Sequence, residues 1–444
     1  MEAIILVHGI KGAVLSLGSE IVWPPTIQEA IFGYGRIDKL LDPACAPSGI
    51  IDSVGCFPVY QGLNDDLSTI CNEIGAQKEV FVYDWRLDIY NKTADALAHN
   101  IEQLASSGAT AITLVCHSMG GLIGRLLLES GTYSNKPWFP KIKRFIGICS
   151  PNLGAPIALS QCLGLESSEG VSGSDLKRFA ADPRYPSGYQ LLPAPVHNAL
   201  YDDVGKQWLD IYDHRVDAAI GLNAQNVDLA KTTFGYLDLG KRPANVDYVL
   251  ISGSGHSTEQ IIELEGPNPS QVIPDDAGDG TVPLWSADSS RVSHYVKPGD
   301  HIGILNTYPF RQTLYSLLAG RIMMSMRFLA AQPTVTVSIN KRTFAPNEQI
   351  SVILVPDTEA REISGTLKLS RAADPDGHSL VEFGTGQAVA YRGPPISRLR
   401  LTLTPPSQPG AYRLAFEGTH ATDDRTAAHF VVSRMAGAQG RPPI

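Results

Sequence analysis

The chain reads Ala111-Ile112-Thr113-Leu114-Val115-Cys116-His117-Ser118-Met119-Gly120-Gly121-Leu122, an apolar strand followed by a sharp turn and the start of a helix. The pattern predicts a nucleophile elbow, in which a serine hydroxyl is exposed above a sheet beside the positive end of a helix. Gly120 and Gly121 favour an elbow over an ordinary strand-to-helix turn, because the helix must approach the strand closely. Cys116 replaces the first glycine of the usual G-x-S-x-G pattern, and we expect it to pack as a small apolar residue.

The surrounding sequence predicts an α/β-hydrolase fold, a mostly parallel sheet with helices on both faces. Residues 1–330 alternate short apolar runs with longer segments of helical period, which is typical of such a sheet. Helices are expected at Thr93–Ser106 and Met119–Ser130, and an amphipathic helix over Tyr308–Ala331. The expected strands are Ala3–Val7, Val80–Tyr83, Ala111–Cys116, Arg144–Cys149, Tyr248–Ser252 and Val292–Val296.

Two segments break this rhythm, residues 12–78 and 151–246, which are rich in Gly, Pro, Ser and Asp. They occur where such folds carry insertions over the carboxyl edge of the sheet. We interpret the second as a cap. The catalytic domain is expected to span residues 1–332.

The pattern of apolar and polar residues changes after residue 332. Short alternating runs, separated by Pro, Gly, Asn and Asp, predict a β-sandwich over residues 333–434 that supplies no catalytic group. Residues 435–444 are expected to form a disordered tail. The expected strands are Thr334–Ile339, Ile350–Val355, Gly365–Leu369, Leu399–Leu403, Tyr412–Phe416 and Ala428–Val432.

Composition narrows the possible partners and the compartment. With 36 Lys and Arg against 45 Asp and Glu, the net charge is −9, so the chain lacks the basic face that nucleic acid requires. Met1 leads directly into the first strand, so we expect no signal peptide and a cytoplasmic protein, and no membrane span. The six cysteines show no metal-binding spacing, although Cys45, Cys56 and Cys71 could pair in an oxidising compartment.

A serine nucleophile needs a base, and the base needs a carboxylate, which follow in the order Ser, acid, His in this fold. Asp279 stands between Gly278 and Gly280, which permit unusual backbone angles. His301 lies in the loop after the last expected strand, where the base belongs. Asp275 and Asp276 are interpreted as solvated turn residues. The other histidines considered, His117 inside the elbow and His294 within a strand, fit the role less well.

Two backbone N–H groups should form the oxyanion hole. One belongs to Met119, the residue after the nucleophile, and the other to Ile10 in the loop Val7-His8-Gly9-Ile10-Lys11-Gly12 after the first strand. The glycines of this loop, Gly9 and Gly12, could alternatively bind a phosphate. However, the G-x-G-x-x-G and Walker spacings are absent, which argues against a nucleotide site.

The chain resembles the lecithin–cholesterol acyltransferase family of α/β-hydrolases. Five motifs carry the resemblance, in the family's order, across residues 1 to 330. They are Val7-His8-Gly9-Ile10-Lys11-Gly12, Tyr83-Asp84-Trp85-Arg86, His117-Ser118-Met119-Gly120-Gly121, Ser187-Gly188-Tyr189-Gln190-Leu191-Leu192-Pro193 and Gly278-Asp279-Gly280-Thr281-Val282-Pro283. The family's nucleophile, acid and base fall on Ser118, Asp279 and His301.

The resemblance implies a lipid-directed enzyme, either a phospholipase A or a transferase of the acyl group to an alcohol. It also implies a lid within residues 12–78 and a membrane-binding subdomain. No metal or cofactor is required. We expect the substrate pocket to include Trp85, Tyr189, Leu191 and Leu192.

Three alternatives remain open at this stage. The chain could be an effector esterase tethered to a protein partner through its C-terminal sandwich, a carboxylesterase for small esters, or a degenerate hydrolase that only binds.

Overall fold

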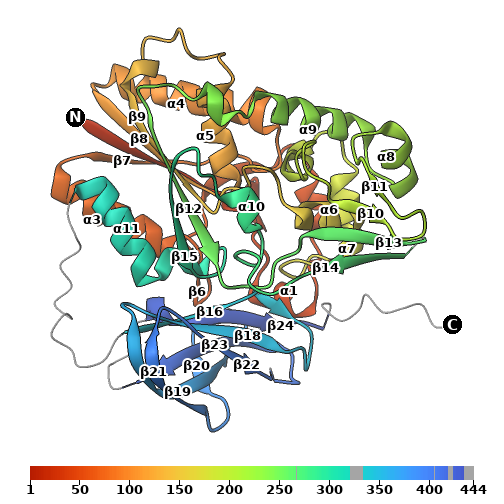
Figure 1. The fold of residues 1–444 in the computed structure, drawn as a ribbon, viewed down its shortest axis with the longest axis vertical. Coiled ribbons are helices and arrows are strands. Elements are labelled where there is room, and N and C mark those ends of the chain that lie inside the picture. The colour runs from red at the N-terminus through yellow and green to blue at the C-terminus, as the bar shows by residue number, and fades with distance from the viewer. Residues whose placement is uncertain (267, 321–333, 405, 419–423, 435–444) are drawn as a thin grey trace.

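A six-stranded, wholly parallel sheet lies at the centre of the first 320 residues (Figure 1). The computed structural model describes residues 1–266, 268–320, 334–404, 406–418 and 424–434. The sheet order is β15-β12-β9-β8-β1-β7, and all six predicted strands are confirmed, with ends shifted by a few residues. Their bounds are β1 Glu2–Val7, β7 Gln77–Phe81, β8 Ala111–His117, β9 Ile142–Ile148, β12 Asp247–Ser254 and β15 Ser293–Pro298.

Helices cover both faces of this sheet, which explains why its inner strands are apolar on both sides. Successive residues of β8 illustrate this, because Leu114 belongs to one hydrophobic cluster and Val115 to the other. The cluster of Val115 packs under α3 (Gln61–Ile74) and α11 (Tyr308–Ala319). The opposite cluster packs under η1 Ile89–Ala94, α4 Asp95–Ser106 and α5 Met119–Glu129.

The predicted helices 93–106 and 119–130 are therefore confirmed. The helix predicted over 308–331 starts at Tyr308 but ends at Ala319, where Gly320 caps it in a left-handed conformation; the predicted range from residue 321 lies outside the described residues. Because α3 covers the sheet, it belongs to the helical layer, and the first insertion is shorter than the expected 12–78.

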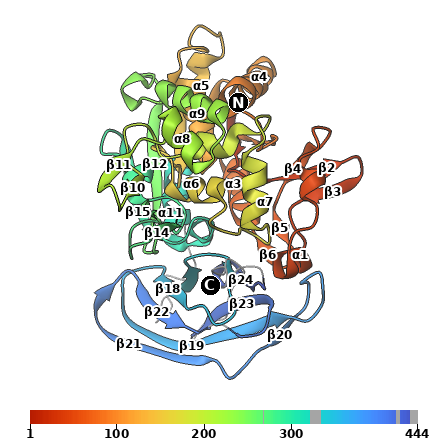
Figure 2. The same ribbon diagram turned by 90° about the vertical axis from the view of Figure 1, so that its right-hand side faces the viewer.

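The first insertion forms a small sheet of order β3-β2-β4 and a hairpin of β5 and β6. Figure 2 shows this insertion at one side of the molecule, with α1 next to the C-terminal strands. Its elements are β2 Ala13–Leu17, β3 Glu20–Trp23, α1 Ile27–Phe32, α2 Ile37–Leu40, β4 Ala46–Ile50, β5 Ser53–Val54 and β6 Phe57–Pro58.

The second insertion forms the expected cap, but the cap also takes in residues beyond 246. Two strands that follow β12 join two strands of the insertion in a sheet of order β11-β10-β13-β14. The cap helices are α6 Pro156–Leu163, α7 Gly173–Ala180, η3 Pro186–Leu191, α8 His214–Ile220 and α9 Ala224–Tyr236. The cap strands are β10 Leu200–Asp202, β11 Gln207–Leu209, β13 Ile261–Glu265 and β14 Asn268–Val272. Short helices η2 Phe139–Lys141, η4 Leu239–Lys241, α10 Leu284–Ala287 and η5 Gly303–Asn306 complete this part.

Two sheets enclose a separate hydrophobic core after residue 334, as the sequence predicts for this part. One has the order β16-β18-β22, and the other has the order β17-β24-β23-β19-β20 with β21 paired to β19. The first contains β16 Val335–Ile339, β18 Ile350–Pro356 and β22 Leu399–Leu403. The second contains β17 Thr343–Phe344, β19 Ala360–Ala372, β20 Leu380–Glu382, β21 Gln387–Ile396, β23 Gly410–Glu417 and β24 Ala428–Val432.

The sequence did not predict β21, because Gly393, Pro394 and Pro395 interrupt the strand pattern. Proline is tolerated there because, among the described strands, β21 pairs with β19 alone and is therefore an edge strand. The expected tail from residue 435 lies outside the described residues.

The sandwich packs directly against the catalytic part (Figures 1 and 2). One hydrophobic cluster joins them, because Ile27, Ile31 and Phe57 of the first insertion pack on Ala411 and Val431 of the sandwich. Ion pairs surround the junction. They join Arg425 to Asp65 and Asp66, and Arg398 and Arg400 to Asp276.

Two further expectations concern membranes and disulfides. Among the described residues, no helix combines the length and apolar character needed to cross a bilayer. None of the six cysteines, all of which lie in the described residues, forms a disulfide, and this includes Cys45, Cys56 and Cys71.

The shared cluster predicts that the two parts lose stability together. Val431→Asp would bury an unpaired charge in the junction, and we expect the midpoint of thermal unfolding to fall by about 5 °C or more. Val381→Asp provides the control, because Val381 is 53% exposed in the same sandwich. Differential scanning calorimetry measures both variants. A Val431→Asp midpoint equal to that of Val381→Asp would contradict a shared core.

Candidate active site

Ser118 lies at a strained turn between β8 and α5. Its backbone angles are φ 54° and ψ −125°, a region that a residue with a side chain adopts only where the surrounding structure imposes it. The glycines after it are sterically required. A Cβ on Gly120 would lie 2.5 Å from the carbonyl oxygen of Val7, and one on Gly121 would overlap Ser150. The predicted elbow thus matches the observed backbone.

A hydrogen-bond chain joins Ser118, His301 and Asp279. His301 Nε2 lies 2.9 Å from Ser118 Oγ, and His301 Nδ1 lies 2.8 Å from Asp279 Oδ2. Because a carboxylate only accepts hydrogen bonds, Nδ1 carries the proton and Nε2 is free to accept from the serine hydroxyl. The structure therefore brings together the three residues predicted from the sequence, in the arrangement of a nucleophile, a base and an orienting acid.

The Asp279 carboxylate is fully buried yet held in its ionised form. Burial alone would raise its pKa, but the His301 ring and the N–H groups of Val282 and Thr281 together hold the pKa below its usual value. These two N–H groups donate to Oδ1 at 2.7 and 2.9 Å, which leaves Oδ2 for His301. The backbone N–H groups thus orient the carboxylate through Oδ1, and His301 pairs with it through Oδ2.

The glycines beside Asp279 serve different purposes. Gly280 has φ +88°, as the sequence led us to expect, whereas Gly278 has no unusual angle. A side chain at Gly278 would instead collide with the carbonyl of Val282. Asp275 and Asp276 lie outside the triad, and Asp276 pairs with the sandwich arginines.

The positions expected for the oxyanion hole lie beside Ser118. Met119 is the first residue of α5, so its N–H has no acceptor within the helix. In the described part of the chain, the N–H of Ile10 donates to no acceptor, and Ile10 lines the cavity above Ser118. A Cβ on Gly9 would lie 2.8 Å from Ser118 Cβ, so only glycine allows this loop to come so close. Both N–H groups are thereby available to an oxyanion.

A second chain of hydrogen bonds, missed by sequence reasoning, runs behind the triad. The Gly9 N–H donates to Tyr60 Oη at 2.8 Å, and Tyr60 Oη lies 2.7 Å from His117 Nδ1. His117 Nε2 lies 3.0 Å from the carbonyl oxygen of His301. Because a carbonyl only accepts, His117 is protonated on Nε2 and accepts from Tyr60 on Nδ1. The chain joins the oxyanion loop to the catalytic base.

Burial, with a contribution from the neighbouring His301, lowers the pKa of His117 to about 3. His117 is therefore neutral and cannot serve as the base at neutral pH. Its position inside the elbow motif is the only sequence signal for this role. Tyr60 has none, since its contact to Gly9 spans 51 residues.

A cavity of about 600 Å³ opens above Ser118 and His301. Its apolar lining comes mainly from the cap and the first insertion and includes Ile10, Trp23, Ile37, Leu40, Trp85, Ile157, Ala158, Leu165, Val171, Leu176, Phe179, Tyr189 and Leu191. Apart from Asp279 and Asp300, its charged lining consists of Lys11, Glu166, Glu169, Glu259, Lys341, Arg342 and Glu348. The sandwich contributes the residues 340–343 and 348, which are all polar.

Three of the four residues expected in the pocket, Trp85, Tyr189 and Leu191, line this cavity. Leu192 does not line it. It follows the last residue of η3, and its side chain is fully buried in the core instead.

Donor atoms of Cys149, Asp279 and His301 lie within 4.8 Å of one another. Burial, and then the neighbouring Asp279, raises the pKa of the Cys149 thiol, so the thiol stays protonated and is a poor metal ligand. Asp279 and His301 are already bonded to each other. The group fits a triad with a thiol packed behind its carboxylate better than a metal centre.

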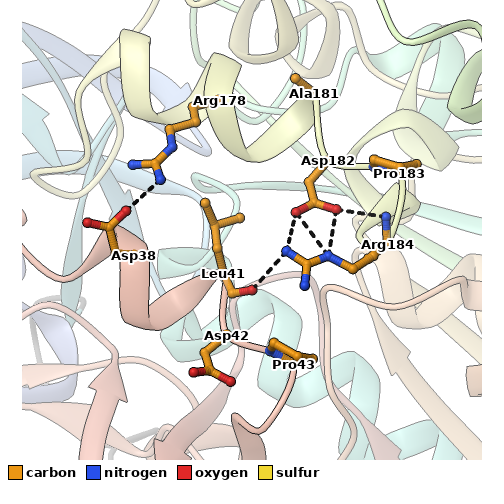
Figure 3. A pocket seen from close by; sticks show the side chains of 9 residues that line it. All are labelled: Asp38, Leu41, Asp42, Pro43, Arg178, Ala181, Asp182, Pro183 and Arg184. Atoms are coloured by element: carbon orange, nitrogen blue, oxygen red, sulfur yellow. Dashed lines mark hydrogen bonds and ion pairs between the residues drawn. The ribbon is translucent and has the colours of Figure 1, made fainter.

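A second pocket lies on the surface between α2 and the end of α7 (Figure 3). Four of its five charged side chains form ion pairs with one another, Arg178 with Asp38 and Arg184 with Asp182. None of its lining residues belongs to the triad or its support. The cavity above Ser118 is therefore the candidate active site.

The parallel sheet, the elbow and the order Ser, Asp, His along the chain define an α/β-hydrolase. Residues 58–208 match the model of the lecithin:cholesterol acyltransferase family, which confirms the resemblance read from the sequence. At a general level the protein is thus placed among α/β-hydrolases that cleave or transfer acyl esters. No curated relative matches the chain significantly.

Several solved structures are similar to this chain at low identity. The Tle4–Tli4 complex has a TM-score of 0.46 and 13% identity, with 71% of this chain and 98% of that chain covered. The lin2722 product from Listeria innocua has a TM-score of 0.35 and 12% identity, with 73% and 96% covered. The Bacillus licheniformis lipase BlEst2 has a TM-score of 0.34 and 12% identity, with 70% and 91% covered.

The carboxylate assignment predicts a steep ranking among neighbouring aspartates. Asp279→Asn should lower the turnover of an ester substrate by about 10³-fold to 10⁴-fold, because His301 loses the group that fixes its tautomer and stabilises its charged form. Asp276→Asn is the matched control, since it removes a carboxylate from the same loop that pairs with the half-buried Arg398 and Arg400 of the sandwich and lies outside the triad. Steady-state kinetics measure both. An equal loss of turnover in the two variants would show that Asp279 is not the catalytic acid.

Proposed function

We propose that this protein is a serine hydrolase of lipid acyl esters, with Ser118 as nucleophile, His301 as general base and Asp279 as the orienting acid. The observation that carries the proposal is the Ser118–His301–Asp279 hydrogen-bond chain. It lies at the base of a cavity whose lining is largely apolar. The family match over residues 58–208 supports the same chemistry.

The reaction follows from this geometry in two steps. His301 Nε2 takes the Ser118 proton as Oγ attacks the ester carbonyl, and the Ile10 and Met119 N–H groups hold the resulting oxyanion. His301 then donates that proton to the leaving alcohol, which produces an acyl-enzyme. A water molecule, deprotonated by His301, attacks the acyl carbonyl and releases the fatty acid and free Ser118.

The composition of the cavity lining supports an amphiphilic substrate. The cap helices α6 and α7 supply an apolar surface, which suits an acyl chain. The lining also carries charges, with Lys341 beside Glu348 on the sandwich and Lys11 near Glu169 elsewhere in the cavity. An ester with its acyl chain under the cap and its polar portion toward the sandwich would satisfy both surfaces.

Acyl transfer to an alcohol is the second candidate reaction, since the matching family is named for it. It needs the same acyl-enzyme, with an alcohol in place of water. Product analysis in the presence of a long-chain alcohol distinguishes the two, because transfer yields a new ester and hydrolysis yields only free acid.

The nucleophile assignment predicts the behaviour of Ser118→Ala. The variant should lose labelling by a fluorophosphonate and lose ester hydrolysis, while its unfolding midpoint stays within a few degrees of wild type. Ser150→Ala is a control that alters another buried serine near the elbow. Intact-mass spectrometry reads the labelling. One label per chain on Ser118→Ala would show that another residue is the nucleophile.

The lipid assignment predicts that specificity depends on acyl length. Each methylene buried under the cap should contribute about 0.8 kcal/mol, which raises kcat/KM by about threefold to fourfold per carbon until the cavity is full. Leu191→Asp should flatten this rise and leave acetyl-ester hydrolysis active. Val196→Asp, at a position 84% exposed, is the matched control. Monomeric esters of increasing length give the profile, and a maximum at two carbons would instead indicate a small-ester hydrolase.

A further inference from the structure

We propose that strand β16 of the C-terminal sandwich braces the two loops that carry Asp279 and His301, and that Ser338 is the positioning residue through which it acts. The inference rests on the proposed function, since it concerns the same triad. It is compatible with the expectation that the sandwich supplies no catalytic group, because a positioning residue acts only through other residues. Figure 1 shows β16 at the side of the sandwich that faces the catalytic part.

Ser338 contacts the loop of the base directly. It is fully buried, and its Oγ accepts from the N–H of Asp300 at 2.8 Å and donates to Asp300 Oδ2 at 2.7 Å. Asp300 immediately precedes His301. One hydroxyl therefore fixes both the backbone and the side chain of the residue next to the base.

Asp300 in turn fixes the residues that follow His301. Its other carboxylate oxygen accepts from the N–H groups of Gly303 at 2.7 Å and Ile302 at 3.3 Å, at the start of η5. His301 lies between these points, and its own N–H donates to the Asp279 carbonyl at 2.9 Å. The backbone on both sides of the catalytic imidazole is thus tied, through Asp300, to β16.

The same hydroxyl also reaches the loop of the acid, through His256. Ser338 Oγ lies 2.8 Å from His256 Nε2. The Ser338 proton is given to the Asp300 carboxylate, so His256 Nε2–H must be the donor in this contact. Burial lowers the pKa of His256, which agrees with a neutral ring that carries its one proton on Nε2.

His256 is joined by its backbone to the residue before Asp279. Its N–H donates to the Gly278 carbonyl at 3.0 Å, and the Gly278 N–H donates back at 3.3 Å. Beyond Asp279, a Cβ on Gly280 would collide with the carbonyl of Asn340, two residues after Ser338. The sandwich is therefore linked to the acid loop on both sides of the catalytic carboxylate, through His256 at Gly278 and directly at Gly280.

Removal of this hydroxyl would leave three buried polar atoms without their partner, namely the Asp300 N–H, an Asp300 oxygen and His256 Nε2–H. A buried donor or acceptor without a partner is unfavourable, so the two loops would rearrange to find others. A small displacement of the base or acid lowers turnover strongly without removing any catalytic group.

Thr336 provides an internal comparison. It is buried on the same face of the same strand, two residues before Ser338. In the described part of the chain its hydroxyl forms no hydrogen bond with either catalytic loop. A variant at Thr336 therefore shows how a change on this face of β16 affects the protein when the hydrogen bonds of Ser338 are kept.

The test compares Ser338→Ala, Ser338→Cys and Thr336→Val in the full-length protein. Hydrogen exchange read by mass spectrometry follows the peptides that span residues 277–282 and 299–304. Steady-state kinetics on one monomeric ester give kcat and KM below the unfolding temperature of each variant. Ser338→Cys leaves no cavity, since the thiol is only somewhat larger than the hydroxyl, and it replaces a strong hydrogen-bonding group by a weak one. It is the variant to use if Ser338→Ala does not fold.

We expect both Ser338 variants to exchange faster in the two loops, and kcat to fall by about tenfold to a hundredfold with KM within about twofold of wild type. Thr336→Val should leave both measurements near wild type. Unchanged exchange at 299–304, or equal effects from Thr336→Val, would overturn the inference. Wild-type protein that hydrolyses no ester would instead refute the proposed function, while the exchange data would still decide whether the brace exists.

Discussion

The hydrogen bond between His301 and the Asp279 carboxylate is the interaction on which the rest of the site depends. A carboxylate without solvent favours protonation, and a protonated Asp279 could not hold the imidazole in the required tautomer. The structure offsets this with the N–H groups of Thr281 and Val282, both directed at one oxygen. These two N–H groups can point at the carboxylate only because the backbone turns at Gly280. The conformation of the loop therefore keeps Asp279 ionised.

Three other histidines surround the triad, and all three are structural. His8, His117 and His256 are buried, and burial lowers the pKa of each one. Each is fixed by hydrogen bonds, with His117 between Tyr60 and His301, and His256 against Ser338. Neutral rings connect the loops without adding positive charge beside His301. The charge that develops on His301 during the reaction therefore has Asp279 as its main partner.

Each part of the chain contributes a different component of the site. The parallel sheet holds Ser118 at its carboxyl edge, the cap supplies apolar cover, and the sandwich supplies a polar wall together with the support of Ser338. The sandwich has its own core, but it shares the cluster of Ile31, Phe57 and Val431 with the catalytic part. Stability of the junction and geometry of the triad are thus coupled through a common surface.

The sequence by itself determined the six parallel strands, the elbow and the positions of Ser118, Asp279 and His301 along the chain. These follow from local patterns, because an apolar run, a glycine pair or a loop after a strand constrains the backbone within a few residues. Only the tertiary structure decided that Leu192 faces the core, that β14 joins the cap, and that Tyr60 and Ser338 support the triad. The contact of Ser338 with Asp300 spans 38 residues, and that of Tyr60 with Gly9 spans 51. A hydroxyl has no local preference for a distant partner, so its role is fixed only when folding buries it where that partner needs a hydrogen bond.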